Sequence, residues 1–223
     1  MNIQILYGKE GADLAVGTTV VVDVFRAATV ASYAFQSGAE YIIPVADQVE
    51  AFALREEHPE YILMGEHRGV KIEGFDFGNS PFDISQADLT GKVVVQRTGS
   101  GTQGLVRATG ASTIFFGGFP TLSATAQKVR ECGIETVSII AMEGEGAEDD
   151  IYAKSLRAVL LGEIPKWDEV AEQLHGLLNA QRFFRPEIIS SPREDFDLCS
   201  GVDTLPFAVK LLHKAGNLQL IRV

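Results

Sequence analysis

Ionisable side chains and glycines are concentrated in a few stretches of this chain, and their types are those that bind anions and hard cations. Asp23 and Arg26 follow an apolar run, Arg97 precedes a glycine-rich turn at 99–102, and five carboxylates lie between residues 143 and 150. Arginine forks and backbone N–H groups bind phosphate or sulfonate oxygens, and carboxylates bind Mg²⁺. These stretches therefore predict a site for a small anion, with a hard cation close by.

A further stretch, residues 65–81, is polar and rich in glycine (GEHRGVKIEGFDFGNSP). It has neither the hydrophobic period of a helix nor that of a strand. Long segments of this kind are uncommon in compact domains and are often functional. We interpret it as a loop that contributes to the site; the alternative is a mobile surface loop whose charges are only solvated.

Apolar runs and helical periods alternate along the chain, and this pattern predicts the frame that positions those residues. Strands are expected at 2–7, 18–24, 41–45, 61–64, 92–96, 113–116 and 136–142. Helices are expected at 26–37, 48–57, 102–109, 121–132, 148–161 and 168–180, with a short one starting at Ser80-Pro81. The alternation is typical of an α/β fold, here a three-layer α/β/α arrangement with a largely parallel or mixed sheet.

We expect a single domain over residues 1–223, with 163–223 as a C-terminal annex or a flap over the site. Its last part, 206–223, has the pattern of two strands around a turn at 214–217. Ligands of open α/β sheets bind beyond the carboxyl ends of the strands. The stretches that begin at Asp23, Arg97 and Glu143 each follow a predicted strand, so we expect them to meet.

Composition excludes several classes of protein. The net charge of −11 argues against nucleic acid as a partner, because phosphate backbones need a basic face. No apolar run is long enough to cross a bilayer, and no signal peptide is evident. Cys132 and Cys199 lack the spacing of a disulfide framework, which favours a reducing, cytoplasmic location. A homodimer is a base-rate expectation for such a chain.

Several known chemistries lack their motifs here. The turn at 99–102 is not followed by the Gly-Lys-Ser/Thr of a nucleotide-binding loop, and no histidine pair or CxxC offers a zinc site. Two alternatives stay open for the stretches above. The turn can be a glycine-rich connection without a ligand, and the acids at 148–150 can simply stabilise a helix N-terminus through its dipole.

Four blocks together resemble the motifs of the 2-phosphosulfolactate phosphatases. They are VVVDVFRAATV at 20–30, MGEHRGVKIEGFDFGNSP at 64–81, VVVQRTGSGTQGL at 93–105 and EDD at 148–150. The run from Glu73 to Pro81 is the most specific of them, and FDLCSGVDTLP at 196–206 is also similar. The resemblance implies a Mg²⁺-dependent hydrolase that acts on a small anionic phosphorylated metabolite in coenzyme M biosynthesis.

The resemblance also implies roles for individual residues. Asp23 is expected to bind Mg²⁺, together with Glu148 and Asp149, and Glu66 or Asp76 to orient the attacking water. The phosphate and acid groups would be held by a set of arginines and hydrogen-bonding residues: Arg26, Arg68, Asn79, Ser80, Arg97, Thr98, Ser100, Gly101 and Thr102. An Asp that forms a covalent phosphoryl intermediate is an equally open mechanism.

Three positions differ from the family's usual pattern: Phe25, the run 67–70 and Ser100. Because all three are expected at the substrate, another phosphorylated 2-hydroxy acid is an alternative substrate. A module that binds an anionic metabolite without turning it over is a second alternative. Such a module would explain the arginines and glycines but not the carboxylates.

Overall fold

The computed structural model describes residues 2–133, 135–214 and 217–223. The centre of the predicted C-terminal turn, residues 215–216, lies outside these ranges. In the described part of the chain, no helix is both long and apolar enough to cross a membrane.

The described residues form one mixed sheet and a set of helices. The strands are β1 (Asn2–Tyr7), β2 (Gly17–Val22), β3 (Tyr41–Val45), β4 (Ile62–His67), β5 (Val70–Lys71), β6 (Val93–Arg97), β7 (Ala111–Gly117), β8 (Thr136–Ala141), β9 (Val209–Lys214) and β10 (Asn217–Arg222). The helices are α1 (Gly8–Asp13), α2 (Ala27–Gln36), α3 (Gln48–Glu57), α4 (Pro81–Ser85), α5 (Gly101–Arg107), α6 (Leu122–Glu131), α7 (Glu148–Leu160), α8 (Trp167–Gly176) and α9 (Arg193–Ser200), with 3-10 turns η1 (Phe119–Thr121) and η2 (Asn179–Phe184).

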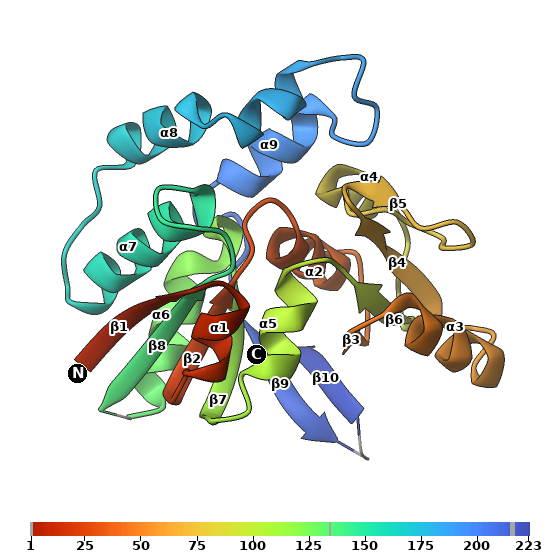
Figure 1. Cartoon of the computed structure of the whole chain (residues 1–223), viewed down its shortest axis with the longest axis horizontal. Helices are drawn as coiled ribbons and strands as arrows, with labels where there is room; N and C mark the ends of the chain where they lie inside the picture. Colours follow the sequence, from red (N-terminus) through yellow and green to blue (C-terminus); the bar gives the residue numbers. More distant parts are fainter. Residues whose placement is uncertain (1, 134, 215–216) are drawn as a thin grey trace.

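The sheet has the order β1-β8-β2-β7-β9-β10-β3-β6-β4-β5. The strands β1, β8, β2 and β7 form one parallel group, and β3, β6 and β4 form another. Between them lies the antiparallel β9–β10 hairpin, which pairs with β7 on one side and β3 on the other (Figure 1). The expectation of an α/β fold with a mixed sheet is thus confirmed.

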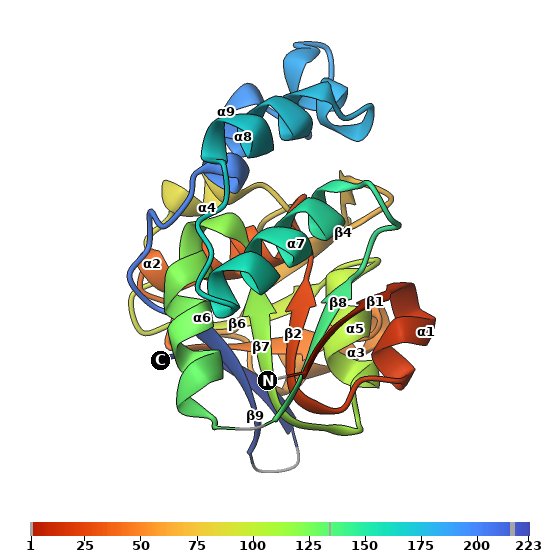
Figure 2. The same cartoon turned by 90° about the vertical axis from the view of Figure 1, so that its left-hand side faces the viewer.

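Helices cover both faces of the first strand group, as Figure 2 shows with α6 on one side of the strands and α1 and α5 on the other. Successive residues of β2 therefore enter different cores. Val20 and Val22 pack in the cluster beneath α6 and α7, whereas Val21 packs in the cluster beneath α2 and α5. This double burial explains why the β2 sequence is apolar without alternation.

Local signals placed several elements accurately. Helix α3 has the predicted bounds, and the Asp47 side chain accepts a hydrogen bond from the backbone N–H of Glu50 at 3.0 Å. Helix α4 begins with Pro81 after the Ser80 cap, as expected. The stretch at 65–81 is less irregular than predicted, because β4 continues to His67 and forms a short hairpin with β5.

The C-terminal part of the chain forms a hairpin within the sheet and a group of helices outside it. The β9–β10 hairpin is an interior part of the sheet, whereas α8, η2 and α9 lie beyond the sheet, above α7 and α2 (Figures 1 and 2). Helix α9 was not predicted, because residues 185–197 (RPEIISSPREDFD) are mostly polar and contain two prolines. The helix predicted at 168–180 ends at Gly176, and η2 follows it.

The twist of the sheet determines how the carboxyl ends of the two parallel strand groups are oriented relative to each other. Through the hairpin, the two parallel groups run in opposite senses, so a flat sheet would place their carboxyl ends at opposite edges. Adjacent strands rotate by roughly 20–25°, and the steps from β2 to β4 accumulate to roughly 120–150°. The rotation turns the second group back toward the first, and contacts described below join the ends of β2, β4 and β6.

Candidate active site

A cavity of about 480 Å³ lies where the ends of β2, β4, β6 and β8 come together. Its walls consist of Asp23, Phe25, Arg26, Glu66, His67, Arg68, Gly69, Asn79, Arg97, Thr98, Gly99, Ser100, Glu143 and Arg182. The strand ends that were expected to meet therefore do so. The lining also includes Arg182 from η2, which lies in the segment 163–223 expected to be an annex or a flap over the site, although Arg182 itself was not predicted.

Asp23 follows β2 and is buried in the floor of the cavity. Its Oδ1 accepts a hydrogen bond from the backbone N–H of Ala27 at 3.0 Å, at the start of α2. Burial raises the pKa of the Asp23 carboxyl to about 6, and the nearby charges of Glu143 and Glu66 contribute in the same direction. A carboxylate of this kind is destabilised as an anion and is stabilised by any cation that reaches it.

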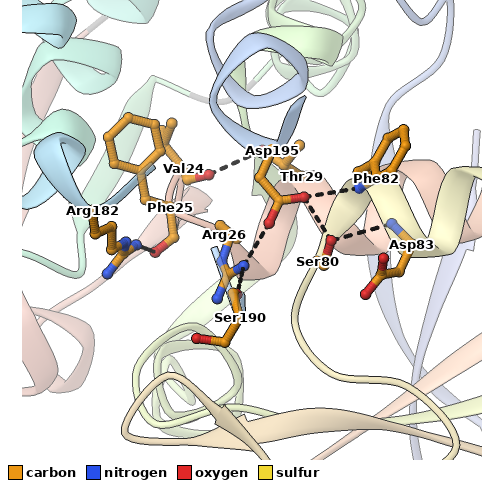
Figure 3. Close-up of polar contacts among 10 residues, drawn as sticks. All are labelled: Val24, Phe25, Arg26, Thr29, Ser80, Phe82, Asp83, Arg182, Ser190 and Asp195. Atoms are coloured by element: carbon orange, nitrogen blue, oxygen red, sulfur yellow. Dashed lines mark hydrogen bonds and ion pairs between the residues drawn. The ribbon is translucent and has the colours of Figure 1, made fainter. Parts of the chain in front are cut away.

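Arg26 is held in a fixed position at the start of α2. Its Nη1 donates to Asp195 Oδ2 at 2.6 Å and to the backbone oxygen of Ser190 at 2.7 Å (Figure 3). The side chain is 3% exposed, and its Nε has no hydrogen-bond partner in the described part of the chain. Arg26 thus has one buried donor available for a ligand.

Asp195, on α9, is a residue of the site that sequence reasoning missed. Besides Arg26, it accepts hydrogen bonds from Ser80 Oγ at 2.7 Å and from the backbone N–H of Phe82 at 3.0 Å (Figure 3). Ser80 was predicted to bind substrate, but it does not line the cavity and is engaged by Asp195. The spacing of buried Phe196 and Cys199 is a local sign of a helix here.

Glu66 joins the β4 end to the glycine-rich turn. Its Oε1 accepts from the backbone N–H of Gly99 at 2.7 Å, and its Oε2 accepts from that of Gly69 at 2.6 Å. Arg97 Nη1 in turn donates to the Glu66 backbone oxygen at 2.6 Å. Both carboxylate oxygens therefore hold backbone in place, so Glu66 shapes two walls of the cavity.

The turn at 99–102 is partly occupied by the protein's own groups. Thr98 and Thr102 cap each other, each hydroxyl accepting from the other's backbone N–H at 3.1–3.2 Å. Of the residues expected to bind substrate here, Thr98 and Ser100 line the cavity, whereas Thr102 does not. Gly101 lies behind the wall, next to Asp23. With the Gly99 and Thr102 N–H groups engaged, little of the expected backbone cradle for an anion is available.

Asp76, expected to orient water, is not in the cavity. Its Oδ2 accepts from the backbone N–H of Leu63 at 2.7 Å and forms an ion pair with Arg55. These contacts hold Asp76 against β4 and α3, and it is not part of the lining of the cavity. Arg68 does line the cavity, at the exposed turn of the β4–β5 hairpin.

Unpartnered polar atoms mark this cavity as a binding site. Asn79 lines it and is 9% exposed, yet its buried Oδ1 has no partner among the described residues. The buried Nε atoms of Arg97 and Arg182 also have no partner there. Buried polar groups in native proteins are nearly always hydrogen-bonded, so their concentration around one cavity indicates a polar ligand.

The first turn of α7 brings three buried carboxylates, and they differ in their partners. Asp150 is satisfied by Lys154 at 2.7 Å and by the hydroxyl of Tyr7 at 2.9 Å, so it has a structural role. Asp149 accepts from the backbone N–H groups of Val24 and Glu143 at 2.7 and 3.0 Å. It therefore ties α7 to the segment that carries Asp23.

Two of these acids, Glu148 and Asp149, are destabilised in their charged form by burial. Burial raises the pKa of Glu148 to about 7, and burial with the charges of Asp23 and Glu148 raises that of Asp149 well above its usual range. No group of three His, Cys, Asp or Glu side chains forms a ready-made metal cluster among the described residues. One or two carboxylates are nevertheless enough for Mg²⁺, and mutually repelling buried acids are the donor set that such a cation would stabilise.

Comparison with known proteins identifies the family. The sequence model of the 2-phosphosulpholactate phosphatases matches residues 7–211. The chain belongs to this family. A probable 2-phosphosulfolactate phosphatase of Bacillus subtilis is 33% identical over 216 residues, covering 95% of this chain and 94% of the relative. One from Parasynechococcus marenigrum is 30% identical over 234 residues, with 94% and 95% covered, and one from Thermoplasma acidophilum is 32% identical over 190 residues, with 82% and 81% covered.

The range matched by the family model includes the whole cavity. All residues that line the cavity fall within the matched range, and so does Asp195. The resemblance inferred from the four sequence blocks is thus confirmed, and a phosphorylated metabolite follows from it as the class of substrate.

Proposed function

We propose that this chain is a Mg²⁺-dependent phosphatase that hydrolyses 2-phosphosulfolactate to sulfolactate and phosphate. The observation that carries the proposal is the juxtaposition of unpartnered arginine donors and the buried carboxyl of Asp23 around one cavity of about 480 Å³. The relatives from Bacillus subtilis and Thermoplasma acidophilum, both probable 2-phosphosulfolactate phosphatases, support the choice of substrate. Another phosphorylated 2-hydroxy acid is the alternative substrate, because the cavity offers the same charges to it.

The residues divide the work of phosphate hydrolysis between them. Asp23 is the carboxylate best placed to bind Mg²⁺, with Glu148 and Asp149 as further candidates. A bound Mg²⁺ supplies charge neutralisation of the phosphate oxygens. Arg26 and Arg97 have unpartnered Nε atoms at the cavity, so they would orient the phosphate group through charge-assisted hydrogen bonds.

Placement of the substrate and of water accounts for most of the remaining chemistry. Asn79 has a free carbonyl oxygen that can accept a hydrogen bond from the substrate or from water. Glu66 keeps the turn at 99–102 and the β4–β5 hairpin at their distance from Asp23 through its two backbone hydrogen bonds. Burial raises the pKa of Asp23, one of the acids that line the cavity, to about 6, which suits a carboxyl that gains a cation or a proton near neutral pH.

The test is phosphate release from phosphosulfolactate, phospholactate and phosphoglycolate, with Mg²⁺ and with a chelator. We expect release that needs Mg²⁺ and prefers phosphosulfolactate. In Asp23→Asn, turnover should fall by about a hundredfold or more, because the cation and the developing charge lose a ligand. Asp168→Asn, on the exposed first turn of α8, is the matched control and should retain activity.

Three outcomes separate the alternatives. Mg²⁺-dependent release that prefers another ester would retain the chemistry and change the substrate. Full activity in the chelator would contradict the metal dependence. No release from any ester, with tight binding of the same esters by calorimetry, would leave the anion-binding module.

A further inference from the structure

Arg182 reaches the cavity from η2, in the C-terminal part of the chain. Its Nη2 donates to the backbone oxygen of Phe25 at 3.1 Å, and its guanidinium carbon lies 4.8 Å from the centre of the Phe183 ring. Figure 3 shows Arg182 beside Phe25, on the side away from Asp195. Phe183 is buried, so these two contacts fix the orientation of the guanidinium. The Nε is buried and has no partner in the described residues.

The charge of Arg182 is not balanced in the way that the charge of Arg26 is. Arg26 pairs with Asp195, whereas no ion pair within the described ranges includes Arg182. Burial and the positive charge of Arg26 both lower the pKa of Arg182, because both disfavour its charged form. Such a group is stabilised by an anionic ligand.

The nearby acids do not remove this imbalance under the proposed function. Glu148 and Asp23 act on Arg182 through their charges. Both are carboxylates that a bound Mg²⁺ would neutralise. Glu148 also already accepts a hydrogen bond from Asn179 at 2.6 Å, and this contact ties η2 to α7. Arg182 is then a cation of the cavity whose counter-charge is left for the substrate to supply.

We propose that Arg182 is a specificity-determining residue that binds the second anionic group of the substrate, a carboxylate or sulfonate that is not hydrolysed. The inference rests on the proposed phosphatase function and deepens it. Arg26 and Arg97 have unpartnered donors for the phosphate, and Arg182 comes from a different element on the η2 side of the cavity. A planar guanidinium suits either acid, because both present two oxygens to its fork.

The test compares four esters that differ only in their second anionic group. Ethyl phosphate has none, phospholactate has a carboxylate, the phosphate ester of 2-hydroxyethanesulfonate has a sulfonate, and phosphosulfolactate has both. In Arg182→Gln, kcat/KM should fall about tenfold to a hundredfold for every ester that has the acid group bound by Arg182. The fall should come mainly from a higher KM. The kcat/KM for ethyl phosphate should change by less than about threefold, because this ester has no group for Arg182 to bind.

Two further variants control for charge and folding. Arg182→Lys retains a charge without the fork and should recover part of the loss. Arg185→Gln changes an exposed arginine of the same segment that does not line the cavity, and it should behave as wild type. A loss confined to the sulfonate esters identifies the sulfonate as the bound group, and one confined to the carboxylate esters identifies the carboxylate.

An equal loss on all four esters, or no loss on any, would overturn the inference. Calorimetry with sulfolactate, which has both acids but no phosphate, separates this result from failure of the proposed function. We expect wild type to bind it and Arg182→Gln to bind it at least about tenfold more weakly. If no ester is turned over and this difference persists, the phosphatase proposal fails and the role of Arg182 stands. Equal affinity of the two proteins would refute that role.

Discussion

Arg26 retains its positive charge inside the protein because a carboxylate from α9 compensates it. The two side chains are 3% and 0% exposed, and their atoms approach to 2.6 Å. Asp195 also accepts hydrogen bonds from Ser80 Oγ and from the backbone N–H of Phe82, so three donors stabilise its carboxylate. A buried pair of this kind is strongly destabilised when one partner is removed, since the other charge remains without water.

Asp195→Asn should therefore lower the free energy of unfolding by about 3–5 kcal/mol. It should also raise KM, because Arg26 loses the contact that orients it. Urea unfolding and steady-state kinetics measure the two effects. Asp197→Asn, an exposed acid on the same helix, is the control and should stay within about 0.5 kcal/mol of wild type. Unchanged stability in Asp195→Asn would show that the buried pair is not maintained in solution.

At the scale of elements, α5 and α2 begin side by side, and a glycine permits this. A Cβ on Gly101 would lie 2.8 Å from Asp23 Oδ2 and 2.9 Å from both the Ala27 Cβ and the Phe116 ring. Real Cβ atoms do not approach other atoms so closely. The absence of a side chain at this position therefore lets the turn after β6 reach the end of β2, where Asp23 lies.

Gly101→Ala should displace Asp23 and reduce activity much more than stability. We expect a loss of about 1–3 kcal/mol in the free energy of unfolding, the usual cost of overpacking. The loss of kcat/KM should exceed what that destabilisation explains at a temperature where the variant is folded. Gly144→Ala, where a Cβ meets nothing within 4 Å, is the matched control. Full activity in Gly101→Ala would show that activity does not depend on the observed position of Asp23.

At the scale of the whole molecule, the β9–β10 hairpin joins the two parallel strand groups. One described residue pair, Leu220 with Ile42, connects β10 to β3, whereas β9 pairs with β7 over several residues. Leu220 is fully buried in the core that spans both groups. Since the cavity takes residues from both groups, this joint holds the two halves of the site together.

Leu220→Ala should lower the free energy of unfolding by about 2–5 kcal/mol, through lost burial and the cavity left behind. Activity and fluorescence should decline together in one urea transition, because the site needs both strand groups. Leu178→Ala, at a side chain that is 92% exposed, should change stability by no more than about 0.5 kcal/mol. Two separate transitions in wild type would show that the groups unfold independently.

The sequence alone determined what depends on neighbours along the chain. The hydrophobic runs located β1 to β8 apart from the short β5, and capping residues located the starts of α3 and α4. These signals are local, because a cap or a strand period acts within a few residues. The same is true of Asp23, Arg97 and Ser100, whose place after a strand predicted their place at the cavity. The motif blocks then identified the family.

Tertiary structure alone decided what depends on contacts between distant segments. Asp195 is 169 residues from Arg26, and Arg182 is 157 residues from Phe25, so no local pattern connects them. Asp76 and Ser80 had suitable types and positions in a motif, yet partners elsewhere in the chain occupy them. The insertion of a C-terminal hairpin between β7 and β3 is decided by pairing and twist, which act only once the sheet has formed.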